Sequence, residues 1–287
     1  MNTDDPKIEI VKRSGERTVF STVHFENSIR RSGAEDDLIH EISISIRQGL
    51  YSGISTKEIF TRTFSLLKKS EPIAASRYKL KQAIYELGDA GFPFKKFIAA
   101  ILYENGFKVK TDEVLQGSCI AHKVDIVGHR EDQFIIVACE FLMDESQKCD
   151  VKVPLYSHSR FRDIHDFYFR KAEEQAPDKG WVVTNSKFSK DAEDYGKCAG
   201  LYLLSWDTPE NESLKDIIDR MGLYPITVST LLTPREKQFL LSRDVVLCKQ
   251  LINDEFYLDH LDVSWKRKEH ILKEIKLLSI HTNEGKS

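Results

Sequence analysis

The sequence predicts an α/β protein, α+β overall, in which a small β-hairpin and helical domain precedes a mixed-sheet domain and a helical C-terminal extension. Three observations support this prediction: apolar and polar residues alternate on both sides of Ser14-Gly15, strand-like and helix-like segments alternate from residue 92 to residue 205, and the chain is helical in pattern after Pro209. We therefore expect three parts, covering residues 1–88, 89–210 and 211–287.

Composition places the chain among globular proteins. Hydrophobic residues make up 41% of the sequence and charged residues 30%, which is ordinary for a soluble domain. A net charge of −3 argues against binding a polyanion over the whole surface, but it leaves room for a local basic face. Because no apolar run reaches the length of a membrane span, and the N-terminus lacks the order of a signal peptide, we expect a cytoplasmic protein that does not enter a membrane. The five cysteines show no paired spacing and are expected to be reduced core residues.

Turn residues and glycines mark the ends of the elements predicted in the first part. Alternation over residues 7–20 predicts a hairpin whose turn is Ser14-Gly15. Gly33 and Gly53 separate the helical patterns that follow, and the last helix ends at Gly88. The predicted helices cover residues 22–33, 36–49, 56–69 and 73–88.

The second and third parts alternate and then turn helical. The predicted helices of the second part are 92–105, 151–175 and 188–198, and its predicted strands are 107–111, 122–128, 134–142, 180–184 and 201–205. The third part holds four helical patterns: SLKDIIDRMG, TPREKQFLLSR, KQLINDEF and WKRKEHILKEIKLL. The polar tail HTNEGKS is expected to be disordered.

Residues 7 to 88 resemble the ATP-cone, a nucleotide-sensing domain known from ribonucleotide reductases and their transcriptional regulators. The resemblance rests on Val11-Lys12-Arg13-x-Gly15, Phe20, the segment Ile54 to Ile59, and Tyr78. It implies that ATP or dATP binds here and that the domain controls oligomeric state, so a homo-oligomer is expected.

Cations beside a tight turn suit such a ligand, because Lys12, Arg13 and free backbone amides can converge on phosphates. Thr56 at a helix start adds a hydroxyl and the helix dipole. By analogy with the family, Ser21 and His24 lie where ribose and phosphates are contacted. Many ATP-cones carry a lysine at the position of His24, so the sequence departs from the pattern there.

The second part resembles Mrr-like nucleases of the PD-(D/E)XK superfamily. Two segments carry this resemblance, one from Gln116-Gly117 through Asp125 to Ile164 and one from Trp181 to Pro209. In that family an Asp and the Glu of an E-x-K pair hold a divalent cation, which polarises the phosphodiester and activates water. The resemblance therefore implies a restriction-endonuclease-like fold and, for an active enzyme, Mg²⁺.

The pattern is incomplete in this sequence. Asp125 matches, but Ala138 stands at the place of the Glu and Glu140 at the place of the Lys. In the helix GFPFKKFIAAIL, Lys95 stands at the place of a metal-side Glu. Since one carboxylate rarely holds magnesium alone, we expect a nuclease fold with a dismantled site.

Several polar residues are candidates for DNA contact without cleavage. Lys95 and Arg160 are expected to hold a phosphate backbone. Thr184, Asn185 and Lys187 lie where a strand leads into a helix, and a helix N-terminus attracts anions.

Three hypotheses remain open from the sequence. The first is a nucleotide-binding regulatory protein whose nuclease-like domain binds DNA or a partner without cutting it. The second is an active, nucleotide-regulated and Mg²⁺-dependent endonuclease in which Glu140, Asp125 and Asp144 supply the metal ligands. The third is a module whose oligomerisation is controlled by nucleotide.

Overall fold

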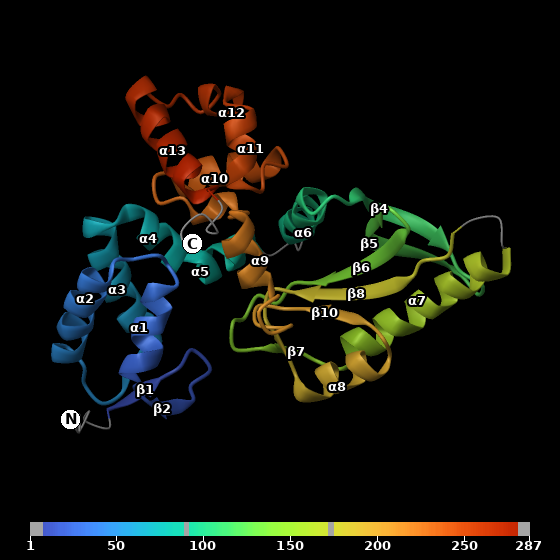
Figure 1. Cartoon of the computed structure of the whole chain (residues 1–287), viewed down its shortest axis with the longest axis horizontal. Helices are drawn as coiled ribbons and strands as arrows, with labels where there is room; N and C mark the ends of the chain where they lie inside the picture. Colours follow the sequence, from blue (N-terminus) through green and yellow to red (C-terminus); the bar gives the residue numbers. More distant parts are fainter. Residues whose placement is uncertain (1–7, 89–91, 172–174, 281–287) are drawn as a thin grey trace.

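The computed structural model describes residues 8–88, 92–171 and 175–280, and it has the predicted α+β class. Figure 1 shows a helical N-terminal region in blue, a twisted sheet with flanking helices in green and yellow, and a C-terminal group of helices in orange and red. None of the helices within the described residues is long and apolar enough to cross a membrane.

The N-terminal region is a small sheet covered by helices. The predicted hairpin is present, with Gly15 at φ +81° in its turn and an Lys12 N–H to Glu16 oxygen bond of 2.8 Å closing it. A third strand, which the sequence analysis did not predict, pairs in parallel with the first of the two. The elements are β1 (Glu9–Val11), β2 (Arg17–Val19), α1 (Thr22–Arg30), α2 (Asp36–Gln48), β3 (Ile54–Ser55) and α3 (Thr56–Ser70).

The helix predicted over residues 73–88 is two helices. Helix α4 (Pro72–Tyr78) ends at Lys79, whose ψ is −4°, and α5 (Leu80–Tyr85) begins directly after it. Ala74 and Ala75 pack into the N-terminal core. The apolar residues of α5 pack instead into the larger core formed with the sheet and the C-terminal helices. The break therefore lets one helical segment serve two cores.

The central domain is a five-stranded mixed sheet in the order β10-β8-β6-β5-β4. Strands β4, β5 and β6 run antiparallel in turn, and β8 and β10 continue the sheet in parallel. The strands are β4 (Lys108–Gln116), β5 (Ala121–Arg130), β6 (Gln133–Glu140), β8 (Lys179–Thr184) and β10 (Tyr202–Leu204), and the helices are α6 (Phe92–Glu104), α7 (Lys152–Lys171) and α8 (Lys190–Cys198).

Alternate residues of β6 face opposite layers, as the two-residue period of a strand requires. Ile135 and Val137 pack with α6 and the C-terminal helices, whereas Phe134 and Ile136 pack with Ile164 of α7. A separate two-stranded parallel sheet, β7 (Lys148–Cys149) and β9 (Lys187–Phe188), lies beyond the end of β6.

The C-terminal helices share the core of the sheet domain. Their apolar residues pack with α5, α6 and one face of the sheet. The elements are α9 (Leu214–Met221), the short 3₁₀ helix η1 (Ile226–Val228), α10 (Pro234–Ser242), α11 (Cys248–Asn253), α12 (Phe256–Asp259) and α13 (Trp265–Leu278). The predicted disordered tail lies outside the described residues.

Glu236 ties α10 to α13. Its carboxylate accepts two bonds from Arg267, at 2.5 and 2.7 Å, and one from the backbone N–H of Thr233, at 2.7 Å. The Arg267 guanidinium, followed by the Thr233 bonds, lowers the pKa of Glu236 from 4.5 to about 2 even though burial opposes this.

We expect Glu236→Gln to destabilise the fold in a pH-dependent way. The pKa of Glu236 is lower in the folded than in the unfolded chain, so its stabilisation is complete above pH 4.5 and is lost as the pH falls toward about 2. Thermal unfolding at several pH values should show the gap between wild type and variant closing across that window. Glu269→Gln, at an exposed position of the same helix α13, is the control. A gap that stays constant down to pH 2 would contradict the assignment.

Candidate functional site

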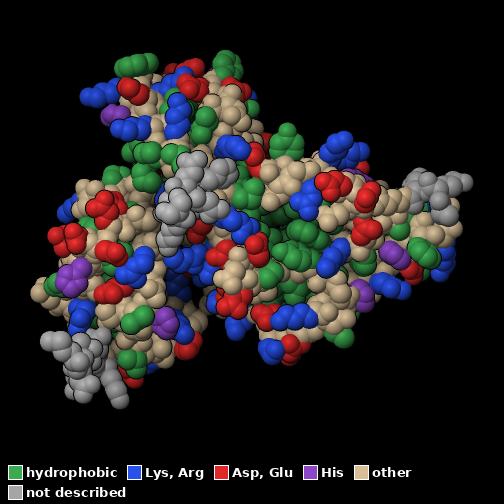
Figure 2. Space-filling model, in the orientation of Figure 1, with side chains coloured by type: hydrophobic (Ala, Val, Ile, Leu, Met, Phe, Trp, Pro, Cys, Tyr) green, Lys and Arg blue, Asp and Glu red, His purple; other side chains and the backbone are tan. Residues whose placement is uncertain are grey.

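A basic cavity of about 510 Å³ lies between the N-terminal region and the sheet domain. Five cationic side chains and two carboxylates, those of Glu16 and Glu145, contribute to its lining. In Figure 2, Lys and Arg side chains gather around the hollow between these two parts of the molecule. The cations are Lys12, Arg13, Lys81, Lys148 and Lys187.

The hairpin turn brings Lys12 and Arg13 to this cavity. Lys12 lies 3.0 Å from Glu16 on the exposed side of the turn. Arg13 forms an ion pair with Glu145, which belongs to the loop between β6 and β7. Both cations therefore have carboxylate partners that a phosphate group can replace.

Thr56 also lines the cavity, at the first position of α3. The residue before it, Ser55, caps the helix by accepting the N–H of Glu58 at 3.1 Å. The other two predicted nucleotide-binding residues serve a different helix. Ser21 caps α1 by accepting the N–H of His24 at 3.3 Å, and neither residue is among those that line the cavity.

The sequence around Lys81 leaves two interpretations open, a solvated stripe of the helix and an added phosphate clamp. Lys81 extends from α5 into the cavity. Burial lowers the pKa of Lys81, and the nearby cations of Lys187 and Arg13 act in the same direction. An ammonium in this situation gains from a bound anion.

The residues that the sequence predicts for a nuclease-like site are centred on Asp125 of β5. One of its carboxylate oxygens accepts the backbone N–H of Cys139 at 2.9 Å. Glu140 ends β6, and burial followed by the charge of Asp125 raises its pKa. The structure therefore places Asp125 and Glu140 close enough for the charge of Asp125 to act on the Glu140 carboxyl.

Lys95 does not reach toward solvent as a phosphate contact requires. It is 8% exposed, and its ammonium lies 2.6 and 2.7 Å from the two oxygens of Asp112 on β4. Lys123 lies 2.9 Å from the same carboxylate. These two lysines lower the pKa of Asp112. Asp112 was not singled out from the sequence. It balances the positive charge of Lys95, which stands at the position where the Mrr-like nucleases have a Glu.

Two members of the predicted DNA-binding set are corrected by the structure. Thr184 and Asn185 are fully buried, so neither is available to a DNA phosphate. Asn185 instead holds the backbone of Leu142 through two bonds of 2.8 and 2.9 Å. Lys187 is exposed, but it faces the basic cavity and forms an ion pair with Asp207.

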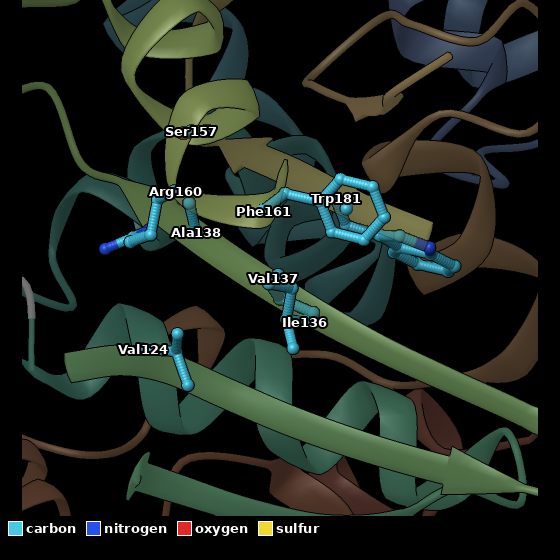
Figure 3. A pocket seen from close by; sticks show the side chains of 9 residues that line it. Val124, Ile136, Val137, Ala138, Ser157, Arg160, Phe161 and Trp181 are labelled. Carbon is cyan, nitrogen blue, oxygen red and sulfur yellow. The ribbon is translucent and has the colours of Figure 1, made fainter. Parts of the chain in front are cut away.

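Arg160 lies on α7 above the edge of the nuclease-like site. Its guanidinium donates to the Lys123 carbonyl at 3.1 Å and lies over the ring of Tyr156. Figure 3 shows it beside Ala138 and above a pocket that is otherwise mainly apolar. That pocket is about 10 Å³, which is room for one water and excludes a nucleotide or a base.

The Gln116-Gly117 and His122 positions of the nuclease resemblance have a structural role. Asp163 of α7 accepts the N–H groups of Cys119 and Ile120 and lies 2.8 Å from the His122 ring. The bond to His122 is the largest of the causes that lower the pKa of Asp163 to about 2. A side chain at Gly117 would bring its Cβ within 2.1 Å of the Asp163 carboxylate. The motif therefore fastens α7 to the β4–β5 turn.

Neither a metal-binding cluster nor a disulfide bond is found among the described residues. Within residues 8–88, 92–171 and 175–280 there is no group of three or more His, Cys, Asp or Glu side chains placed to hold a metal ion. All five cysteines are free, but only Cys149 and Cys248 are buried and Cys139 is partly buried. Cys119 and Cys198 are exposed, which corrects the prediction that all are core residues.

Comparison with known proteins identifies related chains without an assigned activity. Residues 224–279 match a family model described as AF1548-like, C-terminal. An "Uncharacterized protein" of Archaeoglobus fulgidus is 28% identical over 183 residues, covering 62% of this chain and 98% of that protein. A solved structure described as "Protein of Unknown Function AF1548" is 27% identical with a TM-score of 0.52, covering 66% of this chain and 98% of the other.

Proposed function

We propose that this protein is a nucleotide-binding regulatory protein, with ATP or dATP as ligand, whose nuclease-like domain binds DNA without cleaving it. The observation that carries the proposal is the basic cavity, where Lys12 and Arg13 of the hairpin meet the first residue of α3, Thr56. Cations, turn amides and a helix N-terminus all stabilise phosphate oxygens. The volume of about 510 Å³ lies within the range of small-molecule sites.

The arrangement around Asp125 supports binding rather than cleavage. A cation site needs several oxygen ligands, yet the position of one family carboxylate holds Lys95, paired with Asp112. The position of another holds Ala138, which has no ligand atom. Arg160 remains as a cation at the same edge of the domain, within reach of a phosphate backbone.

One observation favours the second candidate, a Mg²⁺-dependent endonuclease. Glu140 lies close enough to Asp125 for the charge of one to raise the pKa of the other. Two carboxylates that repel each other in this way share a cation readily. This arrangement would move the acidic ligand from the place of Ala138 to the end of β6.

Nucleotide binding should be about tenfold weaker in the Lys12→Ala, Arg13→Ala double variant, because each of these partly exposed cations supplies a charge contact worth up to about 1 kcal/mol. Isothermal titration with ATP and with dATP measures the difference. The control is Lys57→Ala, an exposed cation next to Thr56 that does not line the cavity. Equal affinity in wild type and double variant, or no binding heat in either, would overturn the proposal.

A further inference from the structure

The basic cavity has two walls that come from different parts of the chain. One wall is the N-terminal region, with Lys12, Arg13 and Thr56. The opposite wall is the segment beyond the end of β6 together with β9, and it contributes Lys148 and Lys187. Neither of these lysines belongs to the segment that resembles a nucleotide-binding domain.

Lys148 and Lys187 occupy paired positions of the β7–β9 sheet. Like charges directly opposite each other in a sheet destabilise it, so this pairing gains from an anion bound between or above the two ammonium groups. Lys187 has Asp207 as a partner. Among the residues that the structure describes, Lys148 has no ion-pair partner, and its side chain is exposed toward the cavity.

The contact across the cavity is the ion pair between Arg13 and Glu145. Glu145 is largely enclosed, with a side-chain exposure of 15%, while Arg13 is 40% exposed. A triphosphate carries several negative charges, so it competes with a single carboxylate for Arg13. Its binding would leave Glu145 facing phosphate oxygens, which repel it.

The loop that carries Glu145 is held at both ends. Asn185 holds Leu142 at one end, and the hydroxyl of Ser186 donates to the carbonyl of Gln147 at the other. Displacement of Glu145 is therefore confined to the short stretch between them. That stretch follows β6, whose last residue, Glu140, precedes Glu145 by five positions and has a pKa raised by burial and by the charge of Asp125.

We propose that the nuclease-like domain completes the polyphosphate site through Lys148 and Lys187, and that the bound polyphosphate displaces Glu145 from Arg13. The inference rests on the proposed function, since it takes the N-terminal site as the nucleotide site. It takes the ligand to be a polyphosphate and places the signal at the end of β6. The nuclease-like domain thereby contacts the bound nucleotide directly, through Lys148 and Lys187.

The test compares three variants of the full chain by isothermal titration with ATP and with inorganic tripolyphosphate. In Lys148→Gln, Lys187→Gln we expect affinity for both ligands to fall about tenfold, since two charge contacts are lost. In Glu145→Gln we expect binding about threefold tighter, because a competitor for Arg13 is removed. Asp207→Asn is the matched control: it removes the partner of Lys187 but keeps both lysines, and it should bind at least as tightly as wild type.

The outcomes separate this inference from the proposed function. Wild-type affinity in Lys148→Gln, Lys187→Gln combined with weak binding in Lys12→Ala, Arg13→Ala would overturn the inference and leave the nucleotide site in place. Normal affinity in both double variants would overturn both. Weaker binding of ATP but not of tripolyphosphate would contradict the assignment of Lys148 and Lys187 to phosphates. Weaker binding by Glu145→Gln would contradict the displacement, and equal thermal unfolding of all variants confirms that each is folded.

Discussion

Supercoiled plasmid should stay intact when it is incubated with this protein and magnesium or manganese, with or without ATP. Three positions that organise the cation in the Mrr-like nucleases that the sequence resembles hold Lys95, Ala138 and Glu140. Loss of one charge-stabilising group commonly costs a factor of about 10²–10³ in rate, or about 3–4 kcal/mol. Losses within one site do not add, but together they leave little to drive hydrolysis.

The geometry at Lys95 strengthens this expectation. Its ammonium is buried against Asp112, so that carboxylate is already neutralised by a lysine rather than open to a metal ion. Gel electrophoresis of nicked and linear products over several hours is the measurement. Asp125→Ala and Glu140→Gln serve as matched variants. Cleavage by the wild type that disappears in both would establish the endonuclease instead.

Replacing Glu274 with alanine should lower the free energy of unfolding by about 3 kcal/mol. The side chain of Glu274 in α13 is 4% exposed and accepts four hydrogen bonds. The donors are the hydroxyls of Ser76, Ser229 and Thr230 and the backbone N–H of Thr230, at 2.5 to 3.0 Å. Truncation removes the shared acceptor of these donors, although the Ser76 hydroxyl keeps the Pro72 carbonyl at 3.2 Å. Each donor left without an acceptor and out of reach of water costs about 1–3 kcal/mol.

Chemical denaturation followed by circular dichroism measures the change. Glu269→Ala is the matched control, because it removes a carboxylate from the exposed face of the same helix and should change stability by less than about 0.5 kcal/mol. Glu274→Gln keeps one acceptor oxygen and should fall between the two. A loss for Glu274→Ala no larger than for Glu269→Ala would show that the network contributes nothing.

The long, strongly periodic elements of this fold are predictable from sequence, and the two-residue strands are not. Strands such as β6 and helices such as α3 carry enough residues to show their period. Strands β3, β7 and β9 have two residues each, so they exist only through pairing with segments distant in sequence. The break between α4 and α5 at Lys79 is not visible in the sequence either. Apolar residues keep helical spacing on both sides of it, although they face two different cores.

The candidate site residues likewise divide into those placed by local sequence features and those placed by tertiary contacts. Lys12 and Arg13 at a turn and Thr56 at a helix start are local features visible in sequence, but the pairing of Val11 with Ser55 between β1 and β3 is what brings them together. The burial of Lys95 depends on Asp112, which adopts φ +60° in the middle of β4. A strand pattern does not reveal such a position. Likewise, Asn185 looks like a helix-start residue in sequence, but tertiary structure directs its amide to Leu142.

The change of core at Lys79 also has a consequence for the order in which the chain folds during synthesis. The core of the N-terminal region draws its buried residues from positions 10 to 75, so it can close once that stretch has left the ribosome. The second core joins Leu80 to Leu278, a separation of nearly two hundred residues, and it stays incomplete until α13 has been made. A nascent chain stopped before Trp265 would hold a closed first core beside an unfinished second one, although the residues that line the basic cavity, from Lys12 to Lys187, would all have been made.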